Sequence, residues 1–224
     1  MSGNSTLRKY LHRLSVIIIV SLSAAYAQAA IVFDNGAPTT GPEITGYGAD
    51  VPQLTADDFT VPVGNNVISG AHWWGWGLGD VTGSGIHTFT VKVFGDDNAK
   101  PTDAPLLLAF EGSVVGIDVP GSPFPMKSYS VDFAPITVTP EVRYWLSITK
   151  VSPPFSNWVW FAHSGSAGVH AQQGTLGIWT VFPGEAAFYL VSSIPEPASY
   201  TMFLFGLLAF APFRLRTAAQ RWHE

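Results

Sequence analysis

The chain contains no cysteine, and only 12% of its 224 residues are charged, roughly half the typical share of charged residues. Without cysteine, disulfide bonds, cysteine-ligated zinc and cysteine nucleophiles are excluded. Basic residues are also few, since eleven lysines and arginines stand against sixteen aspartates and glutamates. The net charge of −5 and the pI of about 5.6 argue against a protein that binds nucleic acid through a basic surface.

The residues that are abundant are apolar, aromatic or turn-forming. Hydrophobic residues make up 47% of the chain and aromatic residues 13%, which indicates a folded protein rather than a disordered one. The chain also carries 22 glycines and 17 prolines, residue types that interrupt helices and mark turns. The composition therefore favours a globular protein rich in β-structure.

Residues 1–29 have the three regions of a secretory signal peptide. An apolar run over residues 14–22 is preceded by positive charges at Arg8, Lys9 and Arg13. The motif Ala27-Gln28-Ala29 then fits the small-x-small cleavage rule, so we expect cleavage after Ala29 and export of the remaining chain. A membrane anchor is the alternative, but the apolar run is short for a span of about 20 residues.

Residues 194–224 combine three features in a fixed order. A Pro-Glu-Pro triplet comes first, an uncharged apolar stretch at about 199–213 follows, and arginines come last. The triplet consists of Pro195, Glu196 and Pro197, and the arginines are Arg214, Arg216 and Arg221. The apolar stretch is nearly as long as a minimal transmembrane helix, and arginines beyond it are expected to stay in the cytoplasm. The middle of the chain is then expected outside the cytoplasm.

This order of features resembles the PEP-CTERM sorting signal of Gram-negative bacteria. In that family an exosortase, a membrane sorting enzyme, recognises the tail, and the proteins are linked to exopolysaccharide and biofilm formation. The resemblance implies an exported protein that is held in the inner membrane before processing and then reaches the periplasm, cell surface or extracellular matrix. The chain departs from the family pattern at Pro212, late in the apolar stretch, and in the long tail after Arg216.

Residues 30–193 have the size of one domain and carry five basic against fourteen acidic residues, a net charge of −9. Residues 86–94 alternate between apolar and polar, which predicts a strand with Phe89, Val91 and Val93 on one buried face. In the same way residues 143–149 place Tyr144, Leu146 and Ile148 on one face. Further strands are expected at 58–61, 67–70, 129–133, 157–161 and 187–191.

Turn residues separate these segments, and no helical periodicity is present between them. We therefore predict an all-β fold, an antiparallel β-sandwich, with a jelly roll as one candidate connectivity. The middle also resembles a domain often found upstream of this type of tail, through segments that include 56–62, 89–94 and 144–148. That resemblance implies an exported β-sandwich and no particular substrate.

Tryptophans are the first candidates for ligand binding, because aromatic rings stack on the apolar faces of sugars. Trp73 and Trp74 are adjacent, and if they lie in a strand they point to opposite faces, so at most one of them belongs to the core. The candidate glycan-binding residues are Trp74, Trp76 and Trp158. The alternative is that the tryptophans fill the core of the sandwich.

The acidic turn at Asp96, Asp97 and Asn98 is a candidate site for structural calcium, since Ca²⁺ prefers six to eight oxygen ligands. Its spacing does not match the EF-hand, and the alternative is a turn in which Asp and Asn hydrogen-bond to their own backbone.

The histidines show no HExxH spacing, and GxSxG is absent. We therefore predict no enzyme, no catalytic residues and no cofactor other than this candidate calcium.

The favoured function is an exported, non-catalytic protein of the cell surface or matrix, with exosortase and exopolysaccharide as expected partners and no nucleic acid. Two alternatives stay open: a carbohydrate-binding module that uses exposed tryptophans, and a secreted hydrolase. Ice binding ranks last, because the paired threonines at 88 and 90 and at 137 and 139 are too few for a repeated ladder.

Overall fold

The computed structural model describes residues 29–38, 45–77, 86–122, 125–152, 157–163 and 168–192. These residues contain 14 β-strands and no helix, and the strands form two antiparallel sheets. The predicted all-β fold is therefore confirmed, with an arrangement consistent with a β-sandwich. Within these ranges no helix is long and apolar enough to cross a membrane. Apart from Ala29, the predicted signal peptide lies outside the described residues, as do the predicted sorting motif, transmembrane helix and basic tail.

The first sheet has eight strands and is organised around β4 (Val67–Trp76). Strand β8 (Lys127–Thr137) pairs with one side of β4, while β14 (Phe188–Ser192) and β10 (Val159–His163) pair with the other. The remaining strands are β1 (Ala30–Asp34) beside β14, β2 (Gly46–Gly48) and β13 (Glu185–Ala186) beside β10, and β7 (Ile117–Asp118) beside β8.

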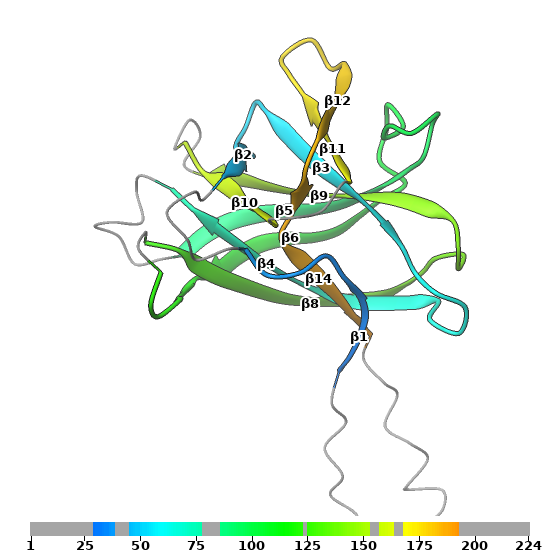
Figure 1. Cartoon of the computed structure of the whole chain (residues 1–224), viewed down its shortest axis with the longest axis horizontal. Coiled ribbons are helices and arrows are strands. Elements are labelled where there is room, and N and C mark those ends of the chain that lie inside the picture. The colour runs from blue at the N-terminus through cyan, green and yellow to red at the C-terminus, as the bar shows by residue number, and fades with distance from the viewer. Residues whose placement is uncertain are drawn as a thin grey trace, which may run out of the picture. The chain divides into compact units, whose positions relative to one another are not determined.

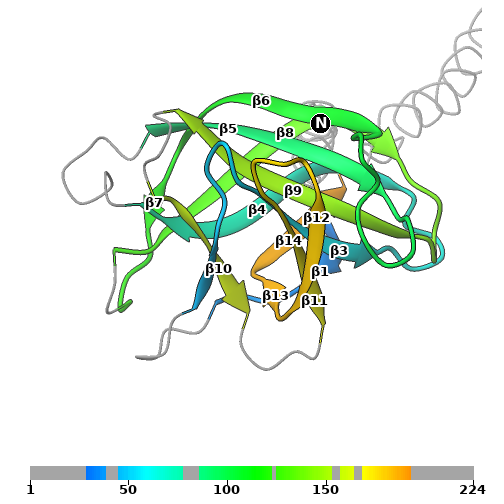
Figure 2. The same ribbon diagram turned by 90° about the horizontal axis from the view of Figure 1, so that it is seen from above.

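The second sheet has six strands in the order β12-β11-β3-β9-β5-β6. They are β12 (Trp179–Pro183), β11 (Val169–Gln173), β3 (Leu54–Thr60), β9 (Arg143–Ser152), β5 (Ile86–Gly95) and β6 (Leu107–Val115). Figure 1 shows the sheets as layers, with β4, β8 and β14 in one and β3, β5 and β9 in the other. Figure 2 shows the same strands from above, where the two layers overlap.

The main core lies between the two sheets. Phe89, Val91 and Val93 of β5 are at most 2% exposed, which confirms the alternation predicted for residues 86–94. Trp73 of β4 meets Phe89 edge-on, with 5.2 Å between ring centroids. Each fully buried large apolar side chain contributes about 1.5–3 kcal/mol, so this contact between the layers is a main source of stability.

Strand β9 is buried on both of its faces. Leu146 and Ile148 are buried as expected, but Trp145 on the opposite face is 0% exposed as well. A second, smaller core covers that face, and it includes Ala56, Phe94, Trp145, Ala171 and Trp179. The indole N–H of Trp179 donates to the carbonyl of Thr102 at 3.2 Å and so ties β12 to the loop that follows β5. The alternation of residues within β9 cannot predict that Trp145 is buried, because the residues that cover it come from distant parts of the chain.

Candidate functional site

Strand β4 divides its aromatic side chains between the two faces of its sheet. Trp73 points into the main core and is 0% exposed, whereas Trp74 is only partly buried. This confirms that at most one of the two belongs to the core. His72 and Trp76 are each two residues from Trp74, so they share its face. That face is the outer, solvent-facing side of the first sheet.

His72, Trp74 and Tyr189 form a cluster of rings on this face, called the outer ring cluster below. His72 lies opposite Tyr189 in the ladder between β4 and β14, and the two rings stack with centroids 4.5 Å apart and planes at 7°. Trp74 stands edge-on to both, at 4.5 Å from His72 and 5.9 Å from Tyr189. Such pairs contribute about 0.5–1.5 kcal/mol each, so the rings support one another without a ligand.

The β8 side of the outer ring cluster is lined by short polar side chains. Ser128 lies opposite Trp74, and Ser130 lies opposite His72. The Nδ1 atom of His72 is 3.0 Å from the hydroxyl oxygen of Ser130. Because serine is small, the Trp74 ring faces no large side chain directly across the ladder to β8. This arrangement offers a flat apolar ring with hydroxyl groups beside it.

The outer ring cluster is uncharged near neutral pH. Burial lowers the pKa of His72 below its usual value, which favours the neutral imidazole. Burial also raises the pKa of Tyr189, and the nearby carboxylate of Asp34 acts in the same direction, which favours the neutral phenol. Asp34 lies directly opposite Tyr189 in the ladder between β1 and β14. The cluster is therefore neutral, with a negative charge at its edge.

The three tryptophans predicted to bind a glycan occupy different environments. Trp74 and Trp76 are partly buried on the outer face of the first sheet. Trp158 is 0% exposed, and its ring lies 5.0 Å from that of Phe89 in the core. A Cβ atom added at Gly75 would clash with the Trp158 indole, which shows how closely β4 packs on it. Trp158 is therefore not available to a ligand in this structure.

His72 and Tyr189 belong to the same surface but were not singled out from the sequence. The spacing of His72 to Trp74 carried a weak signal, since residues two apart in a strand share a face. Nothing local in the sequence places Tyr189 beside them, because β4 and β14 are far apart in the chain. Their contact depends on the register between the two strands.

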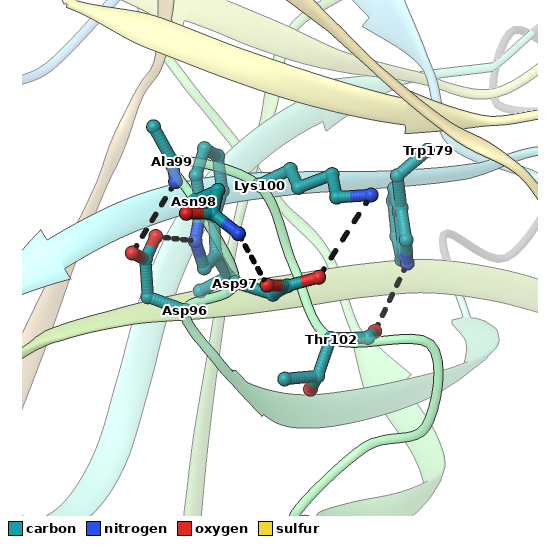
Figure 3. Close-up of polar contacts among 8 residues, drawn as sticks. Asp96, Asp97, Asn98, Ala99, Lys100, Thr102 and Trp179 are labelled. Carbon is teal, nitrogen blue, oxygen red and sulfur yellow. Dashed lines mark hydrogen bonds and ion pairs between the residues drawn. The ribbon is translucent and has the colours of Figure 1, made fainter.

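The predicted calcium ligands form a turn held by internal contacts (Figure 3). Asp96 accepts a hydrogen bond from the indole N–H of Trp145 at 2.9 Å and another from a backbone N–H three residues on. Asp97 accepts from the Asn98 side chain at 2.8 Å and lies 3.9 Å from Lys100 Nζ. The bond from the backbone N–H to Asp96 is the kind that the turn-forming alternative predicts, while the other contacts are made between side chains. Among the described residues no group of three or more His, Asp or Glu side chains is arranged to hold a metal, and calcium binding stays a prediction.

A second group of titratable side chains lies where β2, β3, β11 and β13 meet. Asp57 is 0% exposed, and its Oδ2 accepts a hydrogen bond from the backbone N–H of Ala186. Its Oδ1 has no hydrogen-bond partner within the described part of the chain. Burial raises the pKa of Asp57 well above its usual value, the bond from Ala186 opposes this, and nearby Asp58 and Glu185 add to the rise. The structure therefore favours the protonated carboxyl.

His170 lies opposite Asp57 and joins a short relay of hydrogen bonds. The side chain of Gln53 donates to Gln172 at 3.1 Å, and Gln172 Nε2 lies 3.5 Å from His170 Nε2. His170 Nδ1 lies 3.2 Å from the carbonyl of Gly184. This order fits a neutral histidine that donates from Nδ1 and accepts at Nε2, in line with the lowered pKa that burial imposes on His170. Because His170 and Asp57 are buried, these two side chains offer no surface to a ligand.

Comparison with protein-family models and with curated proteins finds no match for this chain. The fold and the site themselves define the class: an all-β protein of two antiparallel sheets that carries an aromatic cluster on the outer face of one sheet.

Proposed function

We propose that this protein is an exported, non-catalytic component of the cell surface or extracellular matrix that binds polysaccharide through the outer ring cluster. The observation that carries the proposal is the partly exposed ring of Trp74, which His72 and Tyr189 support at 4.5 and 5.9 Å. Sugar rings have apolar C–H faces that stack on aromatic rings and hydroxyl edges that need hydrogen-bond partners. The serines across the ladder supply such partners.

The proposed export and sorting rest on the two ends of the sequence. A signal peptide at 1–29 would direct the chain out of the cytoplasm, and the tail at 194–224 would hold it in the inner membrane until an exosortase-type enzyme acts. Export to a polysaccharide matrix would bring the outer ring cluster into contact with sugar polymers, which supports the proposed binding. For the fold we propose, as in the sequence analysis, a β-sandwich whose strands have jelly-roll connectivity.

The test is polysaccharide binding by the exported protein and two single variants, measured by tryptophan fluorescence and affinity gel electrophoresis. Trp74→Ala removes the central ring and should weaken binding at least tenfold. Phe182→Ala is the matched control, since Phe182 is 41% exposed but lies on β12 of the second sheet. Absence of binding across a broad panel, or equal binding by Trp74→Ala, would refute the proposal. Release of reducing sugars from a bound polymer would favour the hydrolase alternative.

A further inference from the structure

We infer that the polysaccharide bound by the outer ring cluster is uncharged, and that the same face rejects polymers carrying carboxylate or sulfate groups. This inference rests on the proposed function, because it names the ligand class of the same surface.

The first observation is where the basic residues lie. Residues 30–193 contain only five lysines and arginines, and the structure describes all of them. They are Lys92 on β5, Lys100 in the following turn, Lys127 on β8, and Arg143 and Lys150 on β9. Of these only Lys127 belongs to the first sheet, and it is 7% exposed with its Nζ 2.7 Å from an Asp118 carboxylate oxygen. The outer face therefore has no free lysine or arginine to pair with an anionic polymer.

The second observation is that carboxylates stand on both sides of the outer ring cluster. Asp34 is exposed and lies opposite Tyr189 on the β1 side. Asp132 is exposed on β8, two residues from Ser130 and therefore on the same face. Its Oδ1 atom is 3.0 Å from where a Cβ on Gly70 would be, which places the carboxylate over β4. An anionic polymer lying across the rings would meet like charge on each side.

Within the outer ring cluster, His72 is the ring that can become positive. His72 is partly buried, its ring stacks on Tyr189 and meets Trp74 edge-on, and its Nδ1 is already within hydrogen-bond distance of Ser130. Its lowered pKa keeps the imidazole neutral near pH 7. His72 therefore does not offset the two carboxylates at neutral pH.

The same features suit an uncharged, extended chain. Serine hydroxyls both donate and accept hydrogen bonds, so Ser128 and Ser130 on β8 match the hydroxyl groups of neutral sugars. His72, Trp74 and Trp76 follow one another at every second residue of β4, a spacing of about 6.6 Å along the strand. This row favours several consecutive sugar units over a single monosaccharide.

The experiment compares matched neutral and anionic polymers against the exported protein by affinity gel electrophoresis. The probes are hydroxyethyl cellulose, galactomannan and pullulan, each beside its own carboxymethylated form. We expect at least one neutral polymer to bind, and its carboxymethylated form to bind at least tenfold more weakly at about 10 mM salt. The difference should shrink in about 0.5 M NaCl, because salt at that concentration screens charges a few ångströms apart.

A pair of double variants locates the effect. Asp34→Asn with Asp132→Asn should raise affinity for the carboxymethylated polymer several-fold and leave that for the neutral polymer within about twofold. The control is Asp103→Asn with Glu111→Gln, which removes two exposed charges in the loop after β5 and on β6 of the second sheet. The control should change neither affinity by more than about twofold, because its charges lie away from the rings.

The outcomes separate the two proposals. If the carboxymethylated polymers bind as tightly as their neutral parents, or are the only polymers that bind, this inference is overturned and the proposed function stands. If no polymer binds, the proposed function fails and the inference with it. If Trp74→Ala changes the oligomeric state on gel filtration and not polymer binding, the face is an interface between copies, and both proposals are overturned.

Discussion

The sharpest test of the core is the contrast between Trp158→Ala and Trp74→Ala. Both remove an indole, but the two rings have different surroundings. Trp158 is 0% exposed, and its ring meets those of Phe89 at 5.0 Å and Tyr129 at 6.2 Å. Trp74 is partly exposed and loses only its edge contacts with the outer ring cluster.

The expected magnitudes follow from these surroundings. The indole N–H of Trp158 has no hydrogen-bond partner among the described residues, so its removal costs packing alone. Replacing a buried tryptophan by alanine costs about 3–5 kcal/mol, a large part of a typical stability of about 5–15 kcal/mol. For a domain of this size the melting temperature should fall by about 6–20 °C. Trp74→Ala loses two aromatic pairs and should cost about 1–3 kcal/mol, since each pair contributes about 0.5–1.5 kcal/mol.

The assay is equilibrium unfolding in urea, with the free energy extrapolated to water for the wild type and both variants. Polymer binding is measured on the same samples below the unfolding transition. We expect Trp158→Ala to be much less stable while its folded fraction keeps binding. We expect Trp74→Ala to be less destabilised than Trp158→Ala but to bind at least tenfold more weakly than the wild type. If Trp74→Ala were the more destabilised variant, the assignment of Trp158 to the core and Trp74 to the surface would be wrong.

Three further predictions concern the buried acid, the sorting tail and calcium. Burial raises the pKa of Asp57 in the folded state, so the folded protein keeps this proton to a higher pH than the unfolded chain does. The stability that the protonated Asp57 contributes is therefore lost as the pH rises from about 4 through the folded pKa. Asp57→Asn keeps an acceptor for the Ala186 N–H but has no proton to lose. The urea midpoint of the variant should therefore fall less between pH 4 and 8 than that of the wild type, and equal falls in the two proteins would contradict this. Alanines in place of Pro195-Glu196-Pro197 should leave the protein unprocessed in a host with an exosortase, as judged by size and fractionation, and unchanged processing would refute the proposed signal. A calcium site at the turn after β5 predicts a higher melting temperature with calcium than with EDTA, and equal values would exclude it.

Strand structure could be predicted from the sequence where the evidence is local. The alternation of Phe89, Val91 and Val93 with polar neighbours defines a buried face, and the pleat of a strand separates Trp73 from Trp74. Both predictions hold in the structure because side-chain direction in a strand depends on position within a few residues. The all-β class followed from the same alternation and from the turn residues between the strands.

Contacts between distant segments were decided only by the tertiary structure. Trp158 and Trp74 sit in similar local sequence, yet one lies between the sheets and the other on the surface. Trp145 is buried because Trp179 and the loop after β5 cover its face, and Tyr189 reaches His72 through the register of β4 with β14. The physical reason is that a strand's pattern sets which side chains share a face, while the pairing and packing of whole strands decide which face is covered and which rings meet.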